Sequence, residues 1–208
     1  MRTWMLIILS SYLSACAGGL LPEAEPAPQQ WLLHKLEVVD AHTPPNNVVT
    51  NVSLAVERPS AATPLRGKQI WYRNNAHQLT PFSQNIWAES LDIQLQQRVA
   101  EYLGRNWWVQ TSLPDAPGYK ADYRLRLNLQ DWYLNLPQQQ LEITLQASLL
   151  DAAGHSLWHK TWSANPAVTV ASPAAMLQTS QEWLASWVLE LNELLLQQLL
   201  AQKVTALD

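Results

Sequence analysis

The sequence predicts an α+β fold, in which an antiparallel-rich sheet of about six to eight strands carries two amphipathic helices on one face. Several segments alternate apolar and polar residues, which is typical of strands with one buried face. Two segments, at about 83–103 and 173–200, repeat apolar residues at steps of three and four instead, which is typical of amphipathic helices. Three or four strands precede each helix, and this order is that of an α+β domain.

The strands before the first helix are predicted from alternation and turn signals. Segments 32–38 and 52–56 each alternate apolar and polar residues. One face of the first segment consists of Leu32, His34, Leu36 and Val38. Residues 69–73 form a short strand, and Asn74-Asn75 is a tight turn that leads to a partner strand at 77–79.

The first helix is predicted at about 83–103. Thr80-Pro81 is a start signal, because threonine suits the N-cap and proline the first helical turn, and Gly104 is a natural stop. The apolar stripe consists of Trp87, Leu91, Leu95, Val99 and Tyr102. The polar residues Gln94, Gln97, Arg98 and Glu101 fall largely off this stripe.

Strands resume after this helix. They are predicted at 106–111, 123–129, 141–149 and 155–162, and a turn at 151–154 joins the last two into a hairpin. Ser172-Pro173 repeats the helix start signal, and an apolar stripe follows to about residue 200.

The N-terminus is typical of an exported precursor. Arg2 precedes an apolar run from Met5 to Leu13 that is too short to span a bilayer. The run ends in Leu13-Ser14-Ala15-Cys16, which resembles the lipobox of bacterial lipoproteins, and Cys16 is the only cysteine. The resemblance implies cleavage before Cys16 and acylation (palmitate-type chains) of its thiol and amine. An ordinary secretory signal with a chance cysteine is the alternative.

Three regions follow from this interpretation. Residues 1–15 are a lipoprotein signal peptide, residues 16–30 a lipidated Pro-rich tether, and residues 31–208 a single periplasmic α+β domain. Ala17 stands where aspartate resembles an inner-membrane retention signal, which favours the outer membrane over the inner one.

Composition and motifs argue against several classes of function. A net charge of −4 at pH 7 does not favour nucleic-acid binding. The chain has no nucleophile elbow, zinc-binding helix motif or phosphate loop. His155 and His159 lie in a predicted strand, where they would be about 13 Å apart. Glu89 and Asp92 look like a solvated pair. The sequence therefore predicts no enzyme activity, no metal site and no cofactor.

Tryptophan is the remaining signal, with eleven tryptophans against one phenylalanine. Tryptophan favours half-buried sites and interfaces. The candidate partner surface consists of Trp107, Trp108, Trp183 and Trp187. Trp183 and Trp187 lie one helical turn apart, so they either pack the second helix on the sheet or contact a partner.

Several segments together resemble the ABC-type transport auxiliary lipoprotein family, in its paraquat-inducible protein C-like form. The matching segments are Ile70-Trp71-Tyr72-Arg73, Trp87-Ala88-Glu89-Ser90-Leu91 and Ala121-Asp122-Tyr123-Arg124-Leu125-Arg126-Leu127. The resemblance implies a non-enzymatic component of an ABC-linked lipid-transport system that docks the conduit of an MCE-domain protein to the outer membrane, with homo-oligomers as one option. A stand-alone envelope lipoprotein that binds a lipid or small molecule is the alternative, and an envelope hydrolase the third hypothesis.

Overall fold

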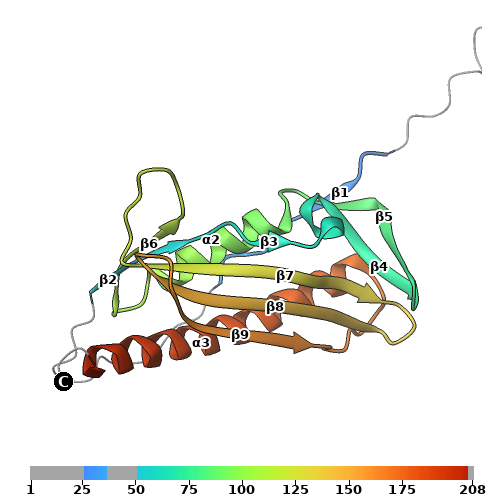
Figure 1. Cartoon of the computed structure of the whole chain (residues 1–208). Helices are drawn as coiled ribbons and strands as arrows, with labels where there is room; N and C mark the ends of the chain where they lie inside the picture. Colours follow the sequence, from blue (N-terminus) through green and yellow to red (C-terminus); the bar gives the residue numbers. More distant parts are fainter. Residues whose placement is uncertain (1–25, 37–50, 206–208) are drawn as a thin grey trace, which may run out of the picture.

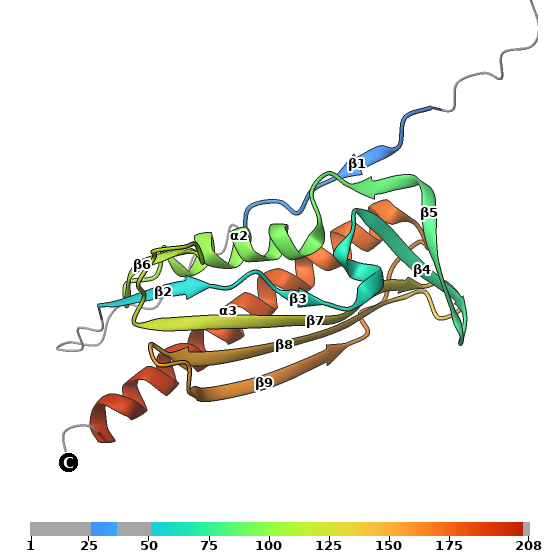
Figure 2. The ribbon, with the colours of Figure 1, turned by 45° about the horizontal axis from the view of Figure 1, so that its top comes forward.

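The computed structural model describes residues 26–36 and 51–205, in which two helices cover one face of a curled sheet (Figures 1 and 2). The strands of the sheet are β1 (Gln29–Trp31), β2 (Val52–Val56), β3 (Ser60–Ala61), β4 (Gln69–Asn75), β5 (Gln78–Trp87), β6 (Val109–Pro114), β7 (Tyr123–Asn135), β8 (Gln140–Asp151) and β9 (Ser156–Ala164). The helices are α2 (Leu91–Leu103) and α3 (Pro173–Thr205), with the short 3-10 helix η1 (Thr63–Arg66) between β3 and β4.

The long strand β7 organises the sheet. One of its edges pairs with β8 in antiparallel orientation, and β8 in turn pairs antiparallel with β9. Its other edge pairs in succession with β2, β3 and β4, and all three run parallel to it. The prediction of an antiparallel-rich sheet is therefore wrong: five of the eight strand pairings in the described residues are parallel, and the sheet is mixed. Alternation of polar and apolar residues reports a buried face but not the direction of the neighbouring strand.

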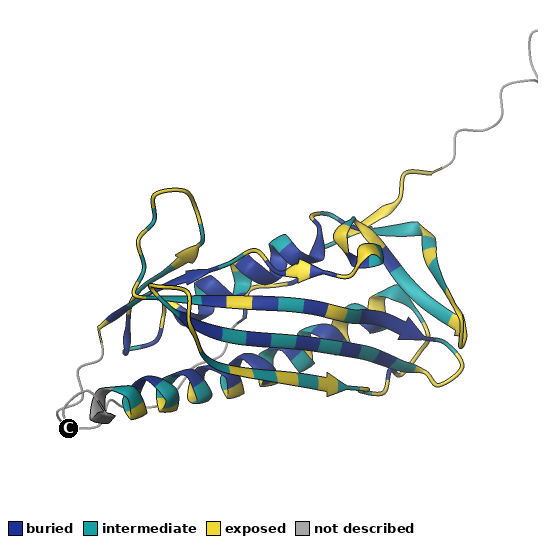
Figure 3. Ribbon diagram, viewed as in Figure 1, coloured by how far each residue is buried: buried dark blue, intermediate teal, exposed yellow. Residues whose placement is uncertain are grey.

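The core lies between the sheet and the helices. Leu125, Leu127 and Leu129 of β7 are fully buried, whereas Arg126 and Gln130 of the same strand face solvent (Figure 3). Leu95 and Val99 of α2 and Leu191 and Leu195 of α3 belong to the same buried cluster. The apolar stripes predicted for both helices thus pack on one face of the sheet.

The second half of the chain follows the prediction closely. The strands predicted at 123–129, 141–149 and 155–162 are β7, β8 and β9, and the helix predicted from Ser172-Pro173 is α3. The strand predicted at 106–111 begins later, at Val109, because Asn106 instead bonds the last turn of α2 through its side-chain amide.

The first helix begins eight residues later than predicted. Residues 78–87 form β5, and the helix begins at Leu91 after Ser90. Thr80 and Pro81 lie inside β5, where β1 pairs only with residues 85–87. At Pro81 the strand pairs with Trp71 of β4 on one edge, whereas β1 does not reach the other edge. Proline is tolerated at such an edge position because it cannot donate to a ladder on both sides. The turn before β5 is formed by Ala76 and His77, not by Asn74-Asn75.

The strand predicted at 32–38 is also corrected. The strand at this place is β1 (Gln29–Trp31), which begins inside the predicted tether, and residues 32–36 have no strand partner. Leu33 and Leu36 are buried, whereas Leu32 and His34 are exposed, so burial does not follow the predicted alternation. Residues 37 and 38 lie outside the described residues.

Candidate functional site, a clamp on the N-terminal segment

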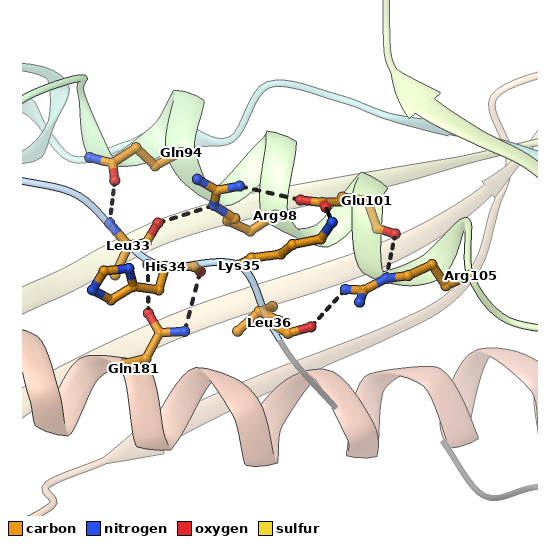
Figure 4. A network of polar contacts seen from close by, with 9 residues as sticks. All are labelled: Leu33, His34, Lys35, Leu36, Gln94, Arg98, Glu101, Arg105 and Gln181. Carbon is orange, nitrogen blue, oxygen red and sulfur yellow. Dashed lines mark hydrogen bonds and ion pairs between the residues drawn. The ribbon is translucent and has the colours of Figure 1, made fainter. Parts of the chain in front are cut away.

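Residues 32–36, the strap, connect β1 with the part of the chain that precedes β2, and they lie between α2 and α3 (Figure 4). Leu33 and Leu36 are 1% and 2% exposed and belong to the core. The strap has no partner strand, so its main-chain polar groups need other partners. Side chains of the two helices supply them.

Gln94 and Arg98 of α2 bind the main chain of Leu33 on both sides. Gln94 Oε1 accepts a hydrogen bond from Leu33 N at 2.7 Å, and Arg98 Nε donates to Leu33 O at 3.1 Å. Gln94 is itself buried, and its Nε2 donates to Glu89 O at 2.6 Å, which fixes the orientation of the amide. A buried amide with both ends bonded is held rigidly, because either bond lost would leave a buried polar atom unsatisfied.

The last residues of the strap contact the last turn of α2 and Arg105 just beyond it. Arg105 Nη2 donates to Leu36 O at 2.6 Å. Lys35 Nζ lies 2.8 Å from Glu101 Oε1, and this contact is the main reason why the pKa of Glu101 is below its ordinary value. Both side chains are partly exposed, so the ion pair adds little stability by itself.

Gln181 of α3 binds the strap from the opposite side. Its Oε1 accepts from His34 N at 3.0 Å, and its Nε2 donates to His34 O at 3.3 Å. These contacts hold four consecutive residues of the strap, from Leu33 to Leu36, and we call the side chains that make them the clamp: Gln94, Arg98, Glu101, Arg105 and Gln181. The arrangement resembles an extended peptide in a groove, but the peptide here is part of the chain itself.

Sequence reasoning missed this clamp, although a signal was present. Gln94, Arg98, Glu101 and Arg105 follow at steps of four, three and four, which places the first three along one side of α2 and the fourth just past its end. A polar stripe of this kind, beside the apolar stripe, is typical of a helix face exposed to solvent. Only the structure shows that a second segment of the chain covers it.

The four candidate tryptophans do not form one surface. Trp108 is fully buried, and its Nε1 donates to Asn192 Oδ1 of α3 at 3.0 Å. Trp187 is 2% exposed and stacks on the half-buried Trp183, with ring centroids 5.9 Å apart. Trp183 also meets Trp132 of β7 edge-on, so this pair packs α3 on the sheet. Trp107 is half-buried and packs against the core.

The predicted solvated acidic pair is also partly wrong. Asp92 is buried, and its Oδ2 accepts a hydrogen bond from Arg58 Nε at 2.6 Å, whereas Glu89 is exposed. Burial opposes the charge on Asp92, but hydrogen bonds from Arg58 and Ser90 and the charge of Arg58 outweigh it, so the pKa of Asp92 is lowered.

The described residues contain no cluster of metal-ligating side chains around the histidines. Exposed His155 contacts Asp151 at 3.0 Å, and no group of three or more metal-ligating side chains occurs within residues 26–36 and 51–205. No helix in the described part of the chain is long and apolar enough to cross a membrane. Cys16 lies outside the described residues.

Comparison with known proteins gives a family and a fold. Residues 34–191 match the model of a family described as ABC-type transport auxiliary lipoprotein component. The structure is similar to a crystal structure of a DUF330 protein from Xanthomonas campestris, with a TM-score of 0.65 and 18% identity, over 87% of this chain and 98% of that chain. It is also similar to the crystal structure of an uncharacterized protein, with a TM-score of 0.63 and 15% identity, over 82% and 99% of the two chains. No curated protein matches the chain.

Proposed function

Because the chain belongs to the family of ABC-type transport auxiliary lipoprotein components, we propose that it is a non-enzymatic docking subunit of a lipid-transport system. Its acyl chains on Cys16 hold it on the periplasmic face of the outer membrane, and its domain receives the distal end of a conduit formed by an MCE-domain protein. The family supports a role in transport, and to this role we add the acyl anchor on Cys16, the outer membrane, the MCE partner and the absence of catalysis.

The clamp on the strap is the observation that carries this proposal. A docking subunit has to hold its partner at a fixed place, so the connection between anchor and domain has to bear load. The chain that comes from Cys16 passes through β1 and then between the two helices, where Gln94, Arg98 and Gln181 bind its main chain. A pull on the anchor is thereby distributed over α2, α3 and the sheet.

The anchor itself is strong enough for this role. Each buried methylene contributes about 0.8 kcal/mol, so several acyl chains together bind a membrane durably. Ala17 in place of aspartate favours sorting to the outer membrane by analogy with bacterial lipoproteins.

The charged groups of the domain also fit a structural role better than a catalytic one. Asp92 pairs with Arg58, Glu142 with Arg73, and Glu57 with Arg126. Each of these carboxylates forms an ion pair with a guanidinium of the same chain. For Asp92, burial opposes the charge, but the hydrogen bond and charge of Arg58 outweigh it, so the pKa of Asp92 lies below its ordinary value, which does not suit a proton donor near neutral pH.

Cross-linking in intact cells tests the proposal. Affinity-tagged wild type is cross-linked, purified from the envelope and examined by mass spectrometry, with Cys16→Ser as a control that is exported but has no anchor. We expect an adduct with an MCE-domain protein for wild type and a much weaker one for the control. An equal adduct would mean that the anchor does not position the domain, and no adduct in either would contradict the proposed partner.

A further inference from the structure

The chain enters the elongated domain at one end. β1 and the first turns of α3 lie at this end, the tether end, whereas β6 and the last turns of α3 lie at the other, the far end (Figures 1 and 2). About ten residues separate Cys16 from Pro26, which gives a reach of roughly 30–35 Å. The 13 residues of β7 extend the domain by a further distance of about 43 Å. An anchor on Cys16 thus keeps the tether end within roughly 30–35 Å of the bilayer, whereas the far end can lie up to about 43 Å farther away.

Two of the three exposed large apolar side chains in the described residues lie at this end. Leu32, Leu113 and Val170 are the exposed large apolar residues of the described chain, at 49%, 47% and 63% exposure. Leu32 follows β1 directly, and Val170 lies three residues before α3, so both belong to the tether end. Leu113 lies on β6 at the far end, which makes it a matched reference.

A groove of about 390 Å³ lies at the same end, between the strap and the first turns of α3. His34, Ala174 and Leu177 line it, together with the aliphatic parts of Gln178, Gln181 and Glu182, and its lining is mostly apolar. The groove lies close in sequence to both exposed residues, because His34 follows Leu32 by two positions and Ala174 follows Val170 by four.

Aromatic and basic side chains flank the same region. Trp31 is half-buried, and its Nε1 donates to Asn85 Oδ1 at 2.9 Å. Exposed Lys68 donates from Nζ to Ala88 O, and Ala88 N donates to Trp31 O, so the ammonium group lies near the chain entrance. Tryptophan and lysine are typical of protein surfaces at the headgroup level of a bilayer, and lysine attracts anionic lipids. Glu182, which also lines the groove, accepts a hydrogen bond from Gln178, and its negative charge opposes this attraction.

We propose that the tether end of the domain rests on the bilayer that holds the anchor, with Leu32, Val170 and the apolar groove beside His34 in contact with phospholipid acyl chains. The proposal rests on the lipid anchor at Cys16 given under the proposed function. It sets an orientation for the domain: the tether end faces the membrane, and the far end with β6 faces the periplasm and any partner.

Site-specific fluorescence on the lipidated protein tests this orientation. The thiol of Cys16 is acylated in the mature protein, so a cysteine introduced by Leu32→Cys, Val170→Cys or Leu113→Cys is the only reactive one. Each variant is labelled with an environment-sensitive NBD group and reconstituted into vesicles of phosphatidylethanolamine with a minor fraction of phosphatidylglycerol. Flotation of the vesicles is measured first, and quenching by doxyl-labelled acyl chains second.

We expect all three variants to float, and the labels at positions 32 and 170 to be quenched several-fold more than the label at 113. Floating protein with equal quenching at all three positions overturns the contact surface but leaves the anchor intact. Protein that does not float contradicts the anchor, and this proposal with it. Labels at 32 and 170 that respond only when an MCE-domain protein is added would assign the surface to that protein and overturn the membrane contact.

Discussion

Gln181 of α3 makes two hydrogen bonds with the main chain of His34, one to the N–H at 3.0 Å and one to the carbonyl at 3.3 Å. The two residues are 147 positions apart, so a single amide joins the segment that leads to the anchor to the last helix of the domain. This contact makes the strap part of the folded domain rather than the end of a linker.

Replacing Gln181 with alanine is expected to loosen the strap. Loss of two hydrogen bonds, each worth about 1 kcal/mol, lowers the free energy of local opening by about 1–2 kcal/mol. Amide hydrogen exchange at residues 33–36 should then be about tenfold faster. Gln178→Ala is the matched control, because Gln178 lies on the same helix and, among the residues that the structure describes, its side chain bonds to the exposed Glu182 and not to the strap. Equal exchange in the two variants would show that Gln181 does not hold the strap.

The pair of Arg58 and Asp92 should make stability depend on pH. The pKa of Asp92 is lowered in the folded protein, so its contribution is present above the unfolded value of about 3.9 and is lost as the pH falls through the lower folded value. Urea unfolding of wild type should show a free energy that falls below about pH 4. Asp92→Asn should be about 1 kcal/mol less stable at neutral pH and should lose less on acidification.

The remaining acid dependence of Asp92→Asn would come from other carboxylates whose pKa values are also lowered, which are Glu101, Asp122, Asp151 and Glu190. Identical pH profiles of wild type and Asp92→Asn would contradict the role given to this pair.

Truncation of Trp108 should destabilise the domain strongly. The indole is fully buried and donates to Asn192, so Trp108→Ala leaves a large cavity and costs about 3–5 kcal/mol of unfolding free energy. Trp107→Ala, next to it but half-buried, should cost about 1 kcal/mol. Urea titrations compare the two, and a larger loss for Trp107 would contradict the core assignment.

Cys16→Ser should separate anchorage from folding. The described fold contains no cysteine, so the urea midpoint of the domain should not change. The protein should leave the membrane fraction and appear in the periplasmic extract, as measured by cell fractionation and immunoblotting. A mutant that remains in the membrane fraction would show that something other than the acyl chains holds it.

Local patterns predicted much of the fold. The hairpin of β8 and β9 and the helix α3 depend on alternation, a short turn and a start signal, all within one stretch of sequence. The parallel pairing of Val56 with Leu125 depends on partners that are 69 positions apart, and alternation carries no information about it. The start of α2 was misplaced because Trp87 stands four residues before Leu91, which extends the helical spacing back into β5.

The clamp could not be predicted from the sequence, for a related reason. Glutamine and arginine beside an apolar stripe have the same pattern whether they face water or a second segment of the chain. Gln94 is buried because the strap covers it, and the alternation of apolar residues in the strap predicts a strand instead of a covering segment. The lipobox, in contrast, is a contiguous motif that needs no tertiary partner to be read.

Co-flotation tests the proposed docking role most directly. The lipidated protein is reconstituted into phospholipid vesicles, a purified MCE-domain protein from the same organism is added, and the vesicles are floated through a density gradient. We expect the MCE-domain protein to float with vesicles that carry the lipidated chain and to remain at the bottom with bare vesicles. An MCE-domain protein that remains at the bottom in both cases would contradict the role of this chain as a docking subunit.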